Sequence, residues 1–513
     1  MKKAFIFLLA FALLSGCQGV QTEIPNRDKS SVTVVMDPAS EPEAGFDPAF
    51  GWGAGEHVHE PLIQSTLTVT KPDLTIGYDL AVDMESSGDG MTWTVKIRDG
   101  VKFTDGEPLT AEDVAFTYNT VKETSSVNDF TMLDRAEAAD GSTVVFHMAR
   151  PFSIWPYTMA SVGILPAHAY DPATYGSNPI GSGRYILKQW DRGQQIILEA
   201  NPDYYGGVPG MKQVILLFME EDAAFLAVQA GQADIAYTSA AYSDQTVNGY
   251  SLLAVQTVDN RGVNLPVTNA SPTIELPIRQ AINMGIDRQA MIDHVLNGYG
   301  TPAYSVCDGL PWYNPVNEVE YDPEGAKALL DEWGWPVGPD GIRVRGTSEY
   351  KLQLSIFYIA GDSVRQGLAA ELANQLRELG IGVDIKGVGW DTAYTYAQVN
   401  PLIWGWGAHT PMELYNIYHT AGPEGYSARY SPYSCPYADE LMDAALACPD
   451  LETSYTLWQE AQEEIAGDVP WVWLVNVEHL YWVRDGLTIA EQKIHPHGHG
   501  WSIVNNVDAW EWK

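Results

Sequence analysis

The chain has 513 residues, of which 45% are hydrophobic and 11% aromatic. This length is too great for one small core, so we expect a globular protein of two or more lobes. Its 66 acidic and 29 basic residues give a net charge of −37, which argues against nucleic acid as a partner because phosphates require Lys/Arg-rich surfaces. An acidic surface favours solubility and permits a cationic ligand.

The first residues have the pattern of a secretory signal. Two lysines precede an apolar run over residues 4–14, and the small residues Ser15 and Gly16 follow. The run is too short for a comfortable bilayer span, and its charged start and small-residue end are typical of a cleaved signal. We therefore predict a signal peptide over residues 1–16.

The stretch "LLSGC" also resembles a bacterial lipobox, in which the cysteine is lipid-modified and becomes the first residue of the mature chain. This assigns lipid attachment to Cys17 and makes the polar residues 17–30 a tether. A plain signal peptide with an incidental cysteine is the alternative. No other long apolar run follows, so we expect an extracytoplasmic, membrane-anchored lipoprotein, either periplasmic or on the outer face of the cytoplasmic membrane.

Three further cysteines, Cys307, Cys435 and Cys448, allow at most one disulfide. A helix between Cys435 and Cys448 would hold them about 17 Å apart at the helical rise, too far to bridge. A bond between Cys307 and Cys435 and three free thiols both stay open. The chain lacks a C-x-x-C pair, so a cysteine-based metal centre is not expected.

The first half of the chain has the alternation of β-structure. "SVTVVM" at 31–36 is a β-branched strand, and residues 91–109 alternate like a hairpin. Thr110 caps a helix whose first turn is acidic, which suits the positive helix end. A further strand at 142–149 and a hairpin at 183–201 follow.

The second half has a different texture. Residues 277–298 are helical, and a strand at 351–361, an amphipathic helix at 363–380 and a strand at 381–390 form a β-α-β unit. An apolar strand at 470–483 comes late in the chain. We predict a β-rich lobe, an α/β lobe and a C-terminus that returns to the first lobe, with a ligand cleft between the two.

Six stretches in order resemble the family 5 extracytoplasmic solute-binding proteins, the receptors of ABC importers for peptides, nickel and related solutes. They are "MTWTVKIRDGVKFTDGEPLTAEDVAFTYN", "NPIGSGRYILKQW", "LEANPDYYGG", "FLAVQAGQADIA", "IRQAINMGIDRQAMIDHVLNGYGTPA" and "YDPEGAKALLDEWGW". The similarity runs from about residue 31 to the end of the chain.

The resemblance implies an α/β, two-lobe periplasmic-binding-protein-like fold (class II, cluster C type) with an extra outer subdomain in the first lobe. On this basis the central subdomain of lobe I covers 31–62, 166–261 and 476–513, the outer subdomain 63–165, and lobe II 262–475. The resemblance also implies no catalysis and no required cofactor. Hinge closure captures a solute and delivers it to the permease and ATPase subunits of the importer.

An enzyme is the competing interpretation, because H-x-H pairs can serve a metallohydrolase. The sequence has no HExxH, no GxSxG and no phosphate-binding GxxxxGK[ST] motif. A metal-dependent extracellular hydrolase that uses the His clusters is therefore kept only as the alternative.

The resemblance also bears on the ligand. Peptide receptors of this family usually hold the peptide's ammonium group with an Asp that follows a Trp-Gly strand end. The matching stretch here, "LIWGWGAHTPMELYNIYHT", has His409 near that position. A neutral His holds an ammonium weakly, whereas imidazole suits Ni(II), and the nickel-importing relatives use a cleft His as metal ligand. A small peptide and a Ni(II)–chelator complex both stay open, with His409 as metal ligand in the second.

Other residue types around such a chelator are aromatic and basic. Trp404 and Trp406 share the stretch with His409 and are predicted to contact the ligand. Arg135, Arg150 and Arg184 are possible carboxylate partners, because a guanidinium grips a carboxylate through two parallel hydrogen bonds. We include Arg135 among the predicted ligand-binding residues.

Two histidine groups complete the candidates. His57 and His59 fall at the expected cleft rim, and "IHPHGHGW" carries His495, His497 and His499. Alternate residues of an extended segment share a face and would hold a metal together, but the intervening Pro and Gly disfavour a regular strand. A framework role is the more typical interpretation for the second group, with metal binding as its alternative, and ligand contact stays open for the first.

Overall fold

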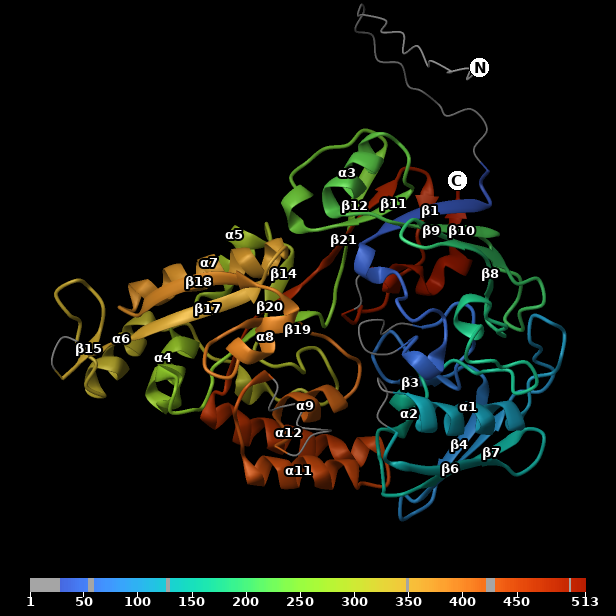
Figure 1. The fold of residues 1–513 in the computed structure, drawn as a ribbon, viewed down its shortest axis with the longest axis horizontal. Coiled ribbons are helices and arrows are strands. Elements are labelled where there is room, and N and C mark those ends of the chain that lie inside the picture. Colours follow the sequence, from blue (N-terminus) through green and yellow to red (C-terminus); the bar gives the residue numbers. More distant parts are fainter. Residues whose placement is uncertain (1–27, 54–59, 126–129, 347–349, 421–429, 498–499) are drawn as a thin grey trace, which may run out of the picture.

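The computed structural model describes residues 28–53, 60–125, 130–346, 350–420, 430–497 and 500–513. Two lobes lie side by side, and three sheets of four or more strands divide between them (Figure 1). The two-lobe α/β architecture agrees with the fold predicted from the sequence. The residue boundaries of its subdomains stay predictions.

Lobe I contains a sheet to which three distant parts of the chain contribute. In spatial order its strands are β12 (Tyr250–Val255), β21 (His479–Arg484), β11 (Ile235–Thr238), β1 (Ser31–Met36), β10 (Gln213–Phe218), β9 (Gln195–Ala200) and β8 (Tyr185–Asp191). The central strand β1 runs parallel to both neighbours. Helix α3 (Glu221–Gln229) covers one face, and the 3-10 helix η9 (Trp501–Ala509) packs on the other. Burial on both faces fits the run of buried apolar residues Val34, Val35 and Met36 in β1.

A second sheet forms the lower part of lobe I in Figure 1. It is antiparallel, in the order β4 (Ala81–Ser86), β5 (Thr92–Ile97), β7 (Thr143–Met148) and β6 (Leu133–Ala138). Helix α1 (Ala111–Thr124) packs against it and begins with a capping box between Thr110 and Asp113. The short α2 (Trp155–Thr158) follows. The predicted alternation of β5 is confirmed, since Trp93, Val95 and Ile97 are buried.

Lobe II is built on a sheet in the order β14 (Gly300–Pro302), β20 (Trp471–Val477), β13 (Asn260–Asn264) and β19 (Ile403–Trp406). Beside it, β17 (Gln353–Ile359), α7 (Ser363–Glu378) and the parallel β18 (Gly382–Val388) form the predicted β-α-β unit. One side of the lobe carries α4 (Leu276–Met284), α5 (Arg288–Val295) and α6 (Pro323–Glu332). The other carries α8 (Trp390–Tyr396), α9 (Met412–Tyr418), α11 (Pro436–Leu446) and α12 (Leu451–Asp468).

Short elements complete the described chain. Paired strands are β2 (Thr68–Thr70) with β3 (Ile76–Tyr78), β15 (Val344–Arg345) with β16 (Tyr350–Lys351), and β22 (Leu487–Thr488) with β23 (Glu511–Trp512). The 3-10 turns include η1 (Pro38–Ser40), η2 (Pro48–Phe50), η4 (Tyr175–Ser177), η5 (Ala240–Tyr242), η6 (Pro272–Ile274) and η7 (Pro315–Asn317).

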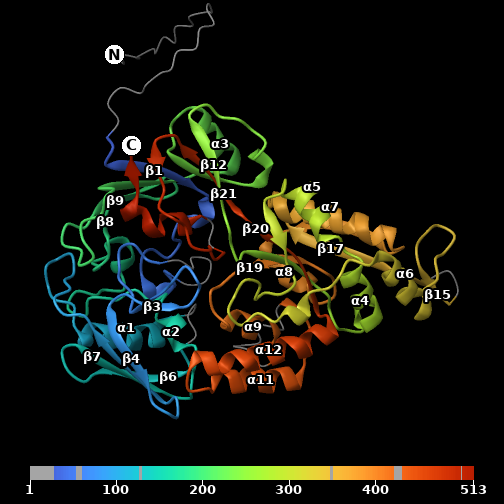
Figure 2. The same ribbon diagram turned by 180° about the vertical axis from the view of Figure 1, so that it is seen from behind.

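The chain passes between the lobes at one end of the molecule, here called the junction (Figures 1 and 2). Residues 256–259 lead from β12 to β13, and Glu478 leads from β20 to β21. The C-terminal segment 494–497 lies alongside them: the amide of His495 donates to the carbonyl of Gln256 at 2.9 Å, and the amide of Val258 donates to the carbonyl of His495 at 2.9 Å.

Two further findings concern the described residues alone. Cys307, Cys435 and Cys448 are free thiols, so the alternative of a Cys307–Cys435 disulfide is not realised. In this part of the chain no helix combines the length and the apolar character needed to cross a bilayer. Cys17, the predicted point of lipid attachment, lies outside the described residues, as do 1–16 and most of the tether.

Candidate functional site at the junction of the lobes

A buried carboxylate organises the junction. Asp259, 2% exposed, forms an ion pair with Arg261. Its Oδ2 lies 3.2 Å from Nε2 of His479, and its Oδ1 lies 2.8 Å from Nδ1 of His497. Burial works against the charge, yet Arg261 and then His497 hold the pKa of Asp259 well below its usual range. One carboxylate therefore joins residues of both lobes and of the C-terminal segment.

The histidines of "IHPHGHGW" divide between partners. His495 is fully buried, with Nδ1 at 3.4 Å from Nδ1 of His479 and Nε2 at 3.1 Å from Oε1 of Gln492. Burial lowers the pKa of His495 well below its usual value, so its ring is neutral. His497 bonds Asp259, and its amide donates to the carbonyl of Gly407 at 2.7 Å. These contacts fit the framework interpretation, which stays a prediction, and His499 lies outside the described residues.

His409 comes three residues after β19, in the loop that His497 touches. It is 9% exposed, and its ring is hydrogen-bonded to the backbone of Ile494. Its Nε2 is buried and has no hydrogen-bond partner among the described residues. Burial, with Lys493 nearby, lowers the pKa of His409 to about 3, so the ring is neutral. A neutral imidazole with an unused nitrogen is a potential ligand for a metal.

Glu413, in the first turn of α9, holds this loop in place. Its Oε2 accepts the amide of Ala408 at 2.7 Å, and its Oε1 accepts that of Gly407 at 3.2 Å. Burial raises the pKa of Glu413 to about 7 despite these two bonds. Two parts of the chain thus hydrogen-bond to the loop: the Glu413 carboxylate of α9 and the main-chain amide of His497 in the C-terminal segment.

An aromatic face of lobe II begins beside the loop. Trp404, 2% exposed, and the partly buried Trp406 lie on β19 with ring centroids 5.8 Å apart. Trp471 and Trp473 of β20 stack in parallel at 5.6 Å, and Trp471 meets the Trp406 ring edge-on at 5.2 Å. Strand β13 lies between β19 and β20, and its Gly262 leaves the space that the Trp473 ring occupies.

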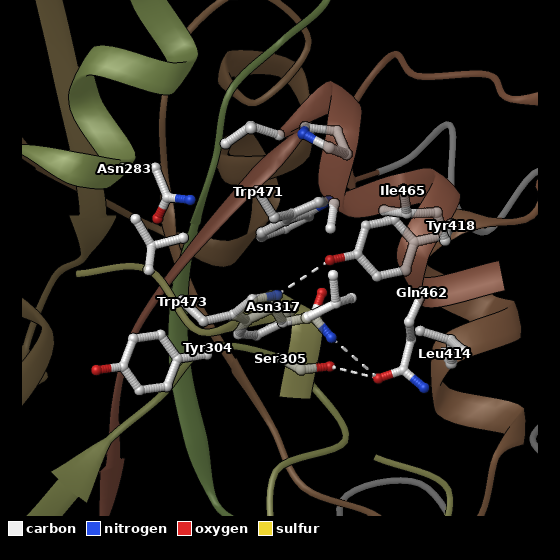
Figure 3. A pocket seen from close by; sticks show the side chains of 15 residues that line it. Asn283, Tyr304, Ser305, Asn317, Leu414, Tyr418, Gln462, Ile465, Trp471 and Trp473 are labelled. Carbon is white, nitrogen blue, oxygen red and sulfur yellow. Dashed lines mark hydrogen bonds between the residues drawn. The ribbon is translucent and has the colours of Figure 1, made fainter. Parts of the chain in front are cut away.

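A small cavity lies at the other end of this face (Figure 3). Its volume is about 70 Å³, and residues of β20, α9, α12 and the segment around Tyr304 line it. Trp473 Nε1 donates to the hydroxyl of Tyr418 at 3.0 Å, and Ser305 donates to Oε1 of Gln462 at 3.2 Å. Sites for small molecules usually measure about 300–1,000 Å³, so this cavity is too small for a cargo.

The arginines lie in different places. Arg135 is half exposed on β6, 3.1 Å from Asp134 and 3.4 Å from Glu137, and β6 lies in the lower part of lobe I, away from β19 (Figure 1). Arg184 bonds Asp508 at 2.9 Å within lobe I. Arg150 is exposed and hydrogen-bonded to Tyr415 of lobe II.

Among the described residues, no group of three or more His, Cys, Asp or Glu side chains has the arrangement of a metal site. His57 and His59 fall outside these residues, so the structure does not place them. Sequence reasoning missed Asp259, Arg261 and Glu413. The charged pair in "VDNRG" is the sequence signal that marks Asp259 and Arg261. The signal for Glu413 is weaker: it lies four residues after His409.

Comparison with known proteins gives a consistent result. The model of the bacterial extracellular solute-binding proteins, family 5 Middle, matches residues 75–428. Protein XP55 of Streptomyces lividans is 31% identical over 90% of this chain and 87% of its own. The oligopeptide-binding protein AppA of Bacillus subtilis is 27% identical over 98% of this chain and 97% of its own. The crystal structure of NikZ from Campylobacter jejuni in complex with Ni(L-His) superposes with a TM-score of 0.78 at 20% identity, covering 94% of this chain and 100% of that one.

Proposed function

Because the chain belongs to family 5 of the bacterial extracellular solute-binding proteins, we propose that it is the lipid-anchored receptor of an ABC importer for a Ni(II)–chelator complex or a small peptide. Proteins of this family bind solutes for a permease and an ATPase, so the chain is a transport protein and not an enzyme. The hydrolase alternative has no support among these relatives.

The nickel cargo is supported by the free nitrogen of His409. Its ring is bonded to the backbone of Ile494, while Nε2 has no partner in the part of the chain that the structure describes. A histidine ring whose Nδ1 donates to a carbonyl keeps a lone pair on Nε2, the arrangement typical of metal-ligating histidines. The aromatic rings of Trp404 and Trp406 would pack against the organic part of the complex. His57 and His59 remain proposed contacts of the same cargo.

A small peptide is the second candidate, supported by a different observation. β19 is the outermost strand in its sheet, and Leu402 just before it is bridged to Phe357 of β17. An extended peptide can bind the rest of such an edge through its main chain. AppA, which is named for oligopeptide binding, is similar to nearly the whole chain. His409 in place of the expected acid disfavours a free ammonium group at that end.

Membrane anchoring through Cys17 rests on the lipobox-like "LLSGC". A labelled fatty acid should be incorporated into the wild type and not into Cys17→Ser. A Cys17→Ser protein that stays membrane-bound after signal cleavage would refute the anchor and leave the receptor function untouched.

Native mass spectrometry without a His tag tests the cargo. With Ni(II) and free histidine, we expect an added mass equal to the metal plus its chelator, and its loss in His409→Ala. His294→Ala is the matched control, because that side chain is 64% exposed on α5. Heterogeneous peptide masses would support the second candidate. Wild-type binding retained in His409→Ala would show that another residue holds the metal.

A further inference from the structure

The two lobes meet a second time, at the end of the molecule opposite the junction. There the segment around α2 and the end of β4 touch the C-terminal end of α11 and the turn that follows it (Figures 1 and 2). We call this the far contact. Its members are Ser86, Ser153 and Tyr157 of lobe I, and Trp312, Ala445, Leu446 and Pro449 of lobe II.

The far contact completes a helix end. The last carbonyls of a helix have no partner within it. Here the amide of Ser153 donates to the carbonyl of Leu446 at 2.9 Å, and its hydroxyl donates to that of Ala445 at 2.9 Å. Ser153 is fully buried. α11 is therefore capped by a residue almost three hundred positions earlier in the chain, from the other lobe.

Apolar packing surrounds these bonds. Tyr157 meets Trp312 edge-to-face, with centroids 5.7 Å apart and planes at 83°. Both rings are buried, and they belong to one continuous apolar cluster that runs from the β4-β5-β7-β6 sheet of lobe I into lobe II. At the rim, Ser86 donates to the carbonyl of Pro449 at 2.8 Å.

We propose that the far contact is a latch, which forms when the lobes close and breaks when they open. The chain crosses between the lobes at the junction, so a rotation about the junction separates the far contact most. Its polar partners are hydroxyls, amides and carbonyls, and water can replace each of them when the contact opens. Closure shields the α11 end and the Tyr157–Trp312 pair from water, and this burial stabilises the closed state. The closed state would then retain the cargo between the lobes. This inference rests on the proposed capture by lobe closure, and it is independent of which solute is carried.

Crosslinking provides the test. Ser86→Cys places a second thiol beside the partly exposed native Cys448, next to Pro449. A short bismethanethiosulfonate reagent should join them within one molecule, and Ser86→Cys/Cys448→Ser should give no such product. Small-angle scattering should show a larger radius of gyration for the uncrosslinked protein than for the crosslinked one, without any added solute. Equal radii would mean a fixed interface and would refute the latch.

Hydrogen exchange gives a second, independent measurement. The amide of Cys448 donates to the carbonyl of Ala445, the same oxygen that Ser153 caps. Ser153→Ala should raise the exchange rate of the peptide spanning 441–450 roughly fivefold, since one net hydrogen bond is lost. The crosslink should suppress that exchange, and the peptide spanning 213–218 of β10 should not change in either case. If neither the substitution nor the crosslink changes the exchange rate of 441–450, the latch proposal is wrong. The nickel and peptide assays would still test the proposed function separately.

Discussion

The junction and the far contact join the same two lobes with opposite chemistry. At the junction, Asp259 is 2% and Arg261 8% exposed, so full charges are buried there. At the far contact the buried partners are a serine, main-chain carbonyls and two aromatic rings. Charged side chains beside it, such as Asp73, Arg150 and Asp450, are exposed.

This difference follows from connectivity. A buried ion pair pays a desolvation cost that it recovers only in a fixed and complete geometry. The crossing strands supply that geometry at the junction, because they cannot separate. When a contact opens, its polar groups become exposed to water, and no charge may remain buried without a partner. Neutral donors and carbonyls meet that condition.

The largest expected effect comes from breaking the network at the junction. Asp259→Asn removes the carboxylate bonded to the buried Arg261, leaving Asp362 as a nearby countercharge, and weakens the bonds to His479 and His497. Removing one partner of a buried pair costs about 3–5 kcal/mol, which urea unfolding should show as a lower midpoint. Asp340→Asn is the control, because its pair with Lys351 is solvent-exposed, and it should leave the midpoint nearly unchanged. An equally small effect at Asp259 would remove the contrast between the two ends.

The pH dependence of Glu413 tests how the junction tolerates an unpaired charge. Burial raises its pKa to about 7 from 4.5, so the folded state binds this proton more tightly than the unfolded state. The stability it contributes is complete below the unfolded pKa and is lost as pH rises through about 7. Between pH 5 and pH 8 this amounts to at most roughly 3 kcal/mol.

Glu413→Gln cannot titrate at this position. From pH 5 to pH 8 its unfolding free energy should therefore rise by that amount relative to the unfolding free energy of the wild type. Urea unfolding at pH 5 and pH 8 measures the gain. Glu324→Gln, at a side chain 81% exposed, should show no such trend. A pH-independent difference for Glu413→Gln would place its carboxyl in contact with water.

The aromatic face that lies beside the junction should show an intermediate effect. A Cβ at Gly262 would lie 2.5 Å from the Trp473 ring, so Gly262→Ala should cost about 1–3 kcal/mol through overpacking. Thermal unfolding checks this, with a shift in tryptophan fluorescence as the ring moves. Gly467→Ala is the control, because it is exposed on α12 with open space at its Cβ, and it should stabilise slightly. Unchanged stability for Gly262→Ala would mean that the ring moves freely.

The sequence predicted what depends on neighbouring residues. The capping box at Thr110, the alternation of β5 and the β-α-β unit around α7 all follow local patterns. The junction and the far contact do not, because Asp259 meets His479 across 220 positions and Ser153 meets Ala445 across 292. Alternation would place His495 and His497 on one face with a shared role. In the structure His495 contacts His479 and Gln492, whereas His497 contacts the carboxylate of Asp259. The sequence places Trp471 and Trp473 in one strand but does not show that their rings lie against Trp406. The space for the Trp473 ring comes from Gly262 in the neighbouring strand.

The smallest expected effect is at the rim of the far contact. Ser86→Ala removes one hydrogen bond to the carbonyl of Pro449, both of which lie near solvent. Water replaces the lost donor, so the free energy of unfolding should fall by about 0.5 kcal/mol or less. The change should not depend on salt, since neither partner is charged. Urea unfolding at low and high ionic strength measures both quantities, with Asp259→Asn run alongside as the large reference. A loss above about 2 kcal/mol for Ser86→Ala would mean that water cannot reach the rim, and the far contact would then be as permanent as the junction.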